Sequence, residues 1–150
     1  METFRPADPE FEARVRDSFS RQAFMSTLGA RLARVAAGEV QIELPFQERL
    51  TQQHGFLHAG AVAAIVDSAC GYSALTLMPP GVAVLTTEYK VNLVAPASGE
   101  AVIARGSVLK AGRTLTVVRG DAFAVQGGRE KLVATMLATV MTVRERGIVD

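Results

Sequence analysis

Residues 59–77 read AGAVAAIVDSACGYSALTL, and this segment restricts the folds that the chain can adopt. As a helix it is apolar on nearly every side, with polar groups only at Asp67, Ser68 and Ser73, so other parts of the chain must surround it. Pro79-Pro80-Gly81 predicts its end. Its length approaches that of a membrane span, but a carboxylate at mid-bilayer costs about 2.5 to 3.5 kcal/mol. We therefore expect a buried helix and no membrane partner.

The segments on either side of this helix carry the patterns of one further helix and several strands. Phe11, Val15, Phe19, Phe24 and Leu28 recur at helical spacing, which predicts an amphipathic N-terminal helix that can break near Ser20. Two short strand candidates before the helix predict a hairpin, and four valine- and threonine-rich runs after it, separated by Gly and Pro turns, have spacings that suit an antiparallel meander. These strands are expected at residues 30–35, 40–46, 82–95, 100–110, 113–125 and 131–143.

The predicted architecture is an α+β fold in which about six antiparallel strands form a curved sheet around the long apolar helix. A chain of 150 residues fits a single domain, which we place at residues 1–150. Within it, residues 1–28 form the N-terminal helical segment and residues 29–143 form the core. The last strands are long, and the exposed edge of such a sheet needs a cover. We expect a second copy of the chain to supply that cover, in a dimer or a dimer of dimers.

Composition excludes several classes of protein. The 16 Lys and Arg residues balance 15 Asp and Glu residues, whereas nucleic-acid grooves and polybasic membrane anchors need a dominant positive charge. One cysteine and two histidines provide neither an intrachain disulfide nor the ligands of a structural zinc site, so we expect no metal. The N-terminus lacks the apolar run of a secretory signal. We therefore expect a cytoplasmic protein.

The segment that leads into the apolar helix carries a motif with fairly specific spacing. A polar amide is followed by a glycine and by a histidine just before the helix, and an aspartate lies nine residues after that histidine. This pattern resembles the hotdog-fold thioesterases of the phenylacetate-degradation (PaaI-like) type, in which His-Gly-Gly opens the central helix. The resemblance covers roughly residues 40 to 140, and Ala59 replaces the first of the two glycines. The matching residues are Gln52, Gly55, His58, Gly60 and Asp67.

The resemblance implies a hotdog fold and an acyl-CoA thioesterase whose site is shared by two chains. It also implies that Thr86, or its neighbour Thr87, orients Asp67 or a water molecule. The anionic CoA moiety should meet basic groups. By resemblance these are Arg113 and Gly112 in a later hairpin, with Lys110 and Arg129 as further candidates. CoA enters as part of the substrate, so no separate cofactor is expected.

Physical reasoning assigns roles to the same residues independently. The start of a helix presents unpaired N–H groups and partial positive charge, so Ala59 N–H, Gly60 N–H and the Gln52 amide are candidate donors to a thioester oxyanion. Asp67 is then the general base or the nucleophile. Ala59 and Asp67 are eight residues apart, or about 12 Å along a helix. Both must reach one reacting carbon, so two antiparallel helices across a dimer axis are predicted.

Alternatives remain open at this point. Asp67 can be a buried structural carboxylate, and His58 can shape the loop without transferring a proton. Cys70 lies about 18 Å along the helix from His58, too far for a Cys–His pair. Phe56 and Leu57, with Ile65 and Tyr72, can line an acyl pocket. The rival functions are a hotdog hydratase or dehydratase acting on hydroxyacyl thioesters and a non-catalytic acyl-CoA sensor.

Overall fold

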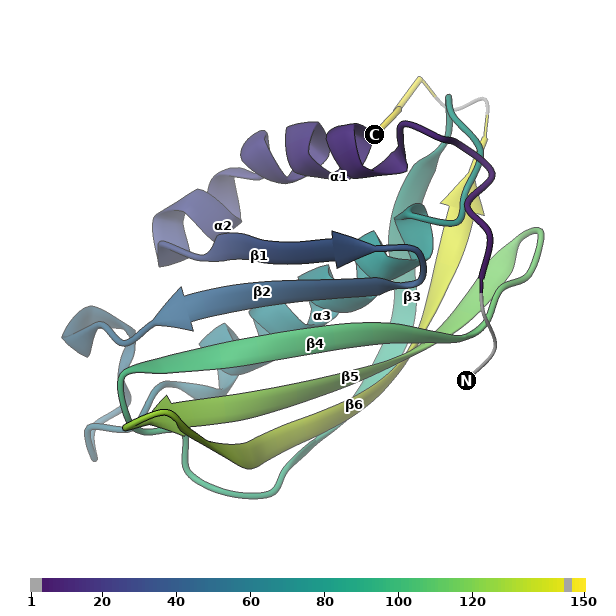
Figure 1. Cartoon of the computed structure of the whole chain (residues 1–150). Helices are drawn as coiled ribbons and strands as arrows, with labels where there is room; N and C mark the ends of the chain where they lie inside the picture. The colour runs from purple at the N-terminus through teal and green to yellow at the C-terminus, as the bar shows by residue number, and fades with distance from the viewer. Residues whose placement is uncertain (1–3, 145–146) are drawn as a thin grey trace.

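The computed structural model describes residues 4–144 and 147–150; residues 1–3 and 145–146 of the predicted domain 1–150 lie outside the described residues. Six antiparallel strands form one sheet that curves around a long helix (Figure 1). The arrangement is the predicted hotdog fold. Its elements are α1 (Phe11–Ser20), α2 (Ala23–Leu28), β1 (Arg31–Ala36), β2 (Glu39–Pro45), η1 (Glu48–Leu50), α3 (Ala59–Leu75), β3 (Ala83–Leu93), β4 (Ala101–Lys110), β5 (Leu115–Gln126) and β6 (Arg129–Val143).

The sheet order corrects one expectation. The strands lie in the order β1-β2-β4-β5-β6-β3, so only β4, β5 and β6 form the predicted meander. The chain leaves β3 and crosses to the middle of the sheet before β4 begins, and β3 pairs with β6 at the far edge. Strand positions follow from local sequence, whereas the pairing of β3 depends on contacts distant in sequence. As a result β3 is an edge strand 11 residues long.

Glycines in the sheet allow α3 to approach its backbone closely. Gly106 of β4 and Gly120 of β5 face each other across the strand pair beneath the middle of the helix. A Cβ atom at Gly106 would lie 2.3 Å from the carbonyl oxygen of Ala69, and one at Gly120 would lie 2.7 Å from Sγ of Cys70. Small residues on both surfaces therefore set the distance between helix and sheet.

The C-terminal end of α3 is held by two other parts of the chain. Thr76 Oγ1 donates to the Ser73 carbonyl and accepts from Gly38 N–H in the β1–β2 turn, both within 2.7 Å. Arg14 of α1 donates to the carbonyl oxygens of Leu75, Met78 and Pro79 at 2.7 to 3.1 Å. These bonds satisfy carbonyl groups that a helix end leaves unpaired.

The predicted elements agree with the structure to within about two residues at most ends. The N-terminal helical segment breaks after Ser20, as expected, into α1 and α2. The central helix ends at Leu75, two residues before the predicted end, and Ser73 is fully buried, so it gives α3 no solvent-facing group. Among the described residues, no helix combines the length and the apolar character required to cross a membrane.

Candidate active site

The loop before α3 is a tight turn closed by its own backbone. Gln52 N–H donates to the Phe56 carbonyl at 2.9 Å, and the Gln52 carbonyl accepts from Gly55 N–H at 3.0 Å. Gly55 has a φ of 82°, the left-handed region that favours glycine. The side-chain oxygen of Gln52 accepts from His54 N–H. This bond orients the amide so that its NH₂ group remains available as a donor.

His58 acts as the N-terminal cap of α3. Its backbone lies outside the helix, and Nδ1 accepts from Gly60 N–H at 2.8 Å. Gly60 N–H is therefore already bonded. This removes it from the two backbone groups, Ala59 N–H and Gly60 N–H, that were predicted to donate to the oxyanion. Ala59 N–H makes no hydrogen bond to any described residue. The structure thus places His58 in the loop-shaping role and leaves Ala59 N–H as the helix donor that a ligand can use.

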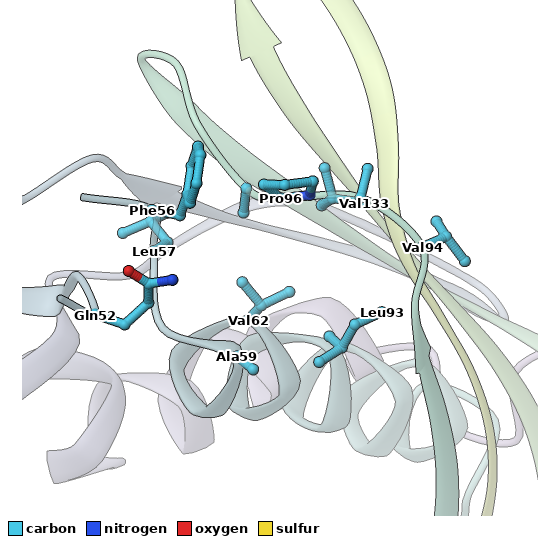
Figure 2. Close-up of a pocket in the computed structure, with 11 residues that line it drawn as sticks. Gln52, Phe56, Leu57, Ala59, Val62, Leu93, Val94, Pro96 and Val133 are labelled. Carbon is cyan, nitrogen blue, oxygen red and sulfur yellow. The ribbon is translucent and has the colours of Figure 1, made fainter. Parts of the chain in front are cut away.

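A cavity of about 490 Å³ opens beside this helix start. Figure 2 shows Gln52 and Phe56 on one side of it and Leu93 and Val94 on the other. Val133 completes the wall, and its carbonyl accepts Val94 N–H at 2.9 Å, so the loop after β3 is fixed against β6. The lining is apolar apart from the Gln52 amide. Such a cavity suits an uncharged acyl group.

Two of the residues expected in an acyl pocket lie elsewhere. Phe56 and Leu57 line the apolar cavity as predicted, but Ile65 is fully buried in the core. Tyr72 lies further along α3, where it borders the cavity around Asp67 and its hydroxyl is 3.3 Å from Ser18 Oγ. The two residues fall on buried faces of α3, and sequence periodicity alone does not distinguish a core face from a cavity wall.

Asp67 and Thr86 come together in a second, smaller cavity of about 110 Å³. Thr86 Oγ1 donates to Asp67 Oδ1 at 2.7 Å. Burial raises the pKa of Asp67 above its ordinary value of 3.8, and the Thr86 hydrogen bond opposes part of that rise. A carboxylate with a raised pKa, held by one hydroxyl and open to a cavity, has the properties of a general base or a nucleophile.

Two residues that the sequence did not indicate share this cavity. Gln22, just before α2, accepts a hydrogen bond from Ser68 Oγ at 3.2 Å. Asp150 accepts from Ser18 Oγ and from Val84 N–H, both at 2.8 Å. Both residues lie more than 40 positions from Asp67 in the chain, so no local motif could have revealed them.

The exposed side of α3 is a stripe of small residues that includes Asp67. Its members repeat at helical spacing and are the residues of α3 after Ala59 that are not buried: Gly60, Ala63, Ala64, Asp67, Ser68 and Gly71. Beside it, Tyr89 and Leu93 of β3 pair with the buried residues Ala138 and Ala134, which places them on the core-facing side of the sheet. They are nevertheless 44% and 53% exposed. One chain therefore leaves an uncovered apolar surface next to its carboxylate.

Three of the four predicted CoA-contacting residues, Gly112, Arg113 and Lys110, lie at the opposite end of α3 from Gln52 and Ala59, whereas Arg129 lies at the start of β6 and borders a different cavity. Gly112 and Arg113, in the β4–β5 turn, border a cavity with Ala74 and Leu77 near the C-terminus of the helix. Gly112 is required there, because a Cβ atom would lie 2.3 Å from the Leu115 carbonyl oxygen. Lys110 is exposed at the end of β4. Within one chain these groups are separate from the apolar cavity.

The geometry of the described residues supports neither a cysteine nucleophile nor a metal site. Burial, with the nearby charges of Asp67 and Asp121, raises the pKa of Cys70 to about 12, so the thiol stays protonated. His54 contacts Gln53 in the exposed loop. Within residues 4–144 and 147–150, no three His, Cys, Asp or Glu side chains gather as a metal site would need.

Comparison with known proteins identifies the family. The model of the thioesterase superfamily matches residues 54–131, which is more than half of the chain. The chain belongs to the thioesterase superfamily. Its enzyme class is thioester hydrolase. A crystal structure of a thioesterase family protein from Silicibacter pomeroyi is 50% identical to this thioesterase, covers 90% of it and 99% of the other chain, and superposes with a TM-score of 0.88.

More distant relatives agree with this assignment. A protein of Saccharolobus solfataricus named as an esterase is 29% identical over 133 residues, covering 87% of the thioesterase and 85% of the relative. A Halobacterium salinarum protein, also named as an esterase, is 33% identical over 98 residues; the match covers 62% of the thioesterase and 64% of that relative. The Escherichia coli PaaI protein of the phenylacetic acid degradation operon, at 16% identity with a TM-score of 0.81, shares the fold.

Proposed function

We propose that this thioesterase hydrolyses an acyl-CoA thioester to a free acid and CoA, in a site that two copies of the chain share. The observation that supports this best is the Asp67–Thr86 pair on the uncovered side of α3. Asp67 acts there as general base for water or as nucleophile at the thioester carbon. CoA arrives as part of the substrate, so the reaction uses no other cofactor.

The oxyanion that forms at the thioester oxygen needs donors, and these lie at the start of α3. Ala59 N–H and the Gln52 amide are the available groups, since Gly60 N–H is held by His58. Removing one such donor in other enzymes costs about 10²- to 10³-fold in turnover. Gly60 contributes its small size, which leaves room for the thioester against the helix end.

The proposed base and the proposed oxyanion donors border different cavities of one chain. This separation supports a site that two chains share. Asp67 borders the small cavity and Ala59 the apolar one, about 12 Å apart along α3. A second α3, packed antiparallel on the stripe of small residues, brings the partner's amide-rich helix start close to Asp67. It also covers Tyr89 and Leu93 of the edge strand β3. A dimer, alone or paired into a tetramer, is therefore the proposed working unit.

Arg113, with Gly112 and Lys110, stays a predicted contact for CoA. Because this turn lies at the C-terminal end of α3, it reaches a substrate only where the second chain contributes the other part of the site.

The experiment is to incubate the purified protein with a panel of acyl-CoA thioesters and to titrate the released CoA thiol. We expect release with uncharged acyl groups that fit a cavity of about 490 Å³. No release from any member, by protein shown to be folded, would contradict the proposal. Spectroscopic loss or gain of an enoyl thioester would instead indicate the hydratase reaction, and binding without turnover would indicate a sensor.

A further inference from the structure

A third cavity, of about 600 Å³, adjoins the apolar one. The two cavities share Pro96, which lies in the loop after β3. The apolar cavity has the Gln52 amide as its polar group, whereas this one is lined by two cations, Arg129 and Lys131, by the carboxylate residue Glu130, and by the polar residues Gln126 and Ser98. A substrate bound at the apolar cavity therefore has charged and hydrogen-bonding residues next to it, on the other side of Pro96.

Strand pairing places both cations on the same side of the sheet as the apolar cavity. Lys131 pairs with Ala124, which is only 6% exposed, and Arg129 pairs with Gln126. Residues that alternate along a strand lie on one face, so Arg129 and Lys131 extend the core-facing surface of β6 outward. Val133, at the β-bulge that follows on β6, lines the apolar cavity. One strand therefore links the two cavities.

The nearby carboxylates leave these cations unpaired. Glu130 pairs with Val125 in register, and its carboxylate binds Arg105 at 2.6 and 2.8 Å; the Arg105 guanidinium also lies over the Phe123 ring. Glu100 accepts Gly127 N–H at 2.9 Å. Among the described residues neither Arg129 nor Lys131 has a carboxylate within 4.0 Å.

From this placement we infer that Arg129 and Lys131 form the subsite that binds the phosphate groups of the CoA nucleotide. The inference rests on the proposed function, because it needs an acyl-CoA in the site. The pantetheine arm separates the thioester from the diphosphate, so the anionic groups must lie away from Ala59 and outside the apolar cavity that the acyl group occupies. Arginine binds phosphate oxygens in a bidentate way and lysine as a point charge, and both are strongest where no carboxylate competes.

The test compares two thioesters of the same acyl group, one on CoA and one on N-acetylcysteamine, which lacks every phosphate. For the natural chain we expect a much lower KM for the CoA thioester. The double variant Arg129→Gln, Lys131→Gln should raise the KM for the CoA thioester about tenfold relative to that for the N-acetylcysteamine thioester. The same ratio should become less sensitive to added salt, because fewer ionic contacts remain to be screened.

A charge-matched control is Arg31→Gln, Arg34→Gln on β1, at the other edge of the sheet. It removes the same net charge, so an unchanged KM ratio there shows that the effect belongs to the subsite and not to overall charge. A third variant, Arg113→Gln, tests the β4–β5 turn. If Arg113→Gln abolishes the preference for CoA while the Arg129, Lys131 variant keeps it, the inference is overturned.

The failures of the two proposals can be told apart. If the natural protein hydrolyses neither thioester, the proposed function fails and the subsite fails with it. If it hydrolyses the N-acetylcysteamine thioester but shows no preference for CoA, thioester hydrolysis stands and the phosphate subsite is wrong. A preference for CoA that the Arg129, Lys131 variant retains in full also rules out the subsite.

Discussion

The two cavities along α3 differ in both size and chemistry. The one at the helix start, about 490 Å³, is apolar and ends at the Ala59 N–H and the Gln52 amide. The one at mid-helix, about 110 Å³, is polar and holds a carboxylate with a raised pKa. The first has room for a substrate but no base, and the second has the base but little room. This difference indicates that neither cavity of a single chain is a complete active site.

The largest expected effect concerns the mid-helix cavity. Asp67→Asn keeps the shape and the Thr86 contact but removes the base, so we expect kcat to fall by about 10³-fold, within the 10²- to 10⁴-fold range of general bases. The measurement is thiol release from the best acyl-CoA at saturation, with circular dichroism and gel filtration to show that fold and assembly persist. A variant with normal turnover would remove Asp67 from the mechanism.

The second effect concerns the cavity at the helix start. It tests whether this cavity and the mid-helix cavity contribute to one active site. Gln52→Ala should lower kcat by about 10²-fold through loss of one oxyanion donor. If each site takes Gln52 from one chain and Asp67 from the other, unfolding and refolding Gln52→Ala and Asp67→Asn chains together creates dimers with one intact site. Random pairing then restores about a quarter of the natural activity. No recovery, with mixed dimers demonstrated, would show that each chain builds its own site.

A smaller effect links Thr86 to the pH profile. The reaction needs ionised Asp67, so kcat/KM should fall as pH drops through the raised pKa of that carboxyl. Thr86→Val removes the hydrogen bond that holds this pKa down, so the acid limb should move to higher pH and the rate on that limb should be lower than that of the natural protein at the same pH. The check is kcat/KM measured across pH for both proteins. An unmoved acid limb would mean that another group controls it.

The smallest expected effect is on stability. Because the folded pKa of Asp67 lies above its ordinary value of 3.8, the protonated carboxyl stabilises the fold at pH below 3.8, and this contribution is lost as pH rises through the folded pKa. At neutral pH the buried charge is a cost, so Asp67→Asn should raise Tm by about 2 °C. Calorimetry should show this gain shrinking toward pH 4. A lower Tm at pH 7 would mean that the ionised form is stabilised by groups other than Thr86.

Much of the fold could be predicted from the sequence because local patterns determine it. The alanine-rich apolar run predicted α3. The valine- and threonine-rich runs between Gly and Pro turns predicted the strands. The position of β3 beside β6 could not be predicted, because it depends on where the chain crosses after Leu93. The β-bulge near Val133, which fixes the wall of the apolar cavity, also has no local signature.

Some features of the candidate site could likewise be predicted from the sequence, and others could not. The spacing of His58 and Asp67 indicated a helix start and a carboxylate, and the resemblance indicated Thr86, which does contact Asp67. Their catalytic roles stay predictions. The sequence did not reveal that His58 occupies Gly60 N–H, because this depends on a side-chain conformation. Nor did it reveal Lys131; Arg129 was a further candidate for CoA contact, but its position next to the apolar cavity depends on the pairing of β6.

Arg14 contacts the last carbonyl of α3, at Leu75, and those of Met78 and Pro79 just after it, and this has a consequence for shortened versions of the chain. The segment that identifies the superfamily, residues 54–131, does not include α1, yet α1 supplies the guanidinium that closes the end of the central helix. It also inserts Val15, which is fully buried, into the core. The segment that identifies the superfamily is therefore shorter than the segment that the fold needs. A truncation at residue 29 would leave the end of α3 without its Arg14 contact and would open a gap in the hydrophobic core.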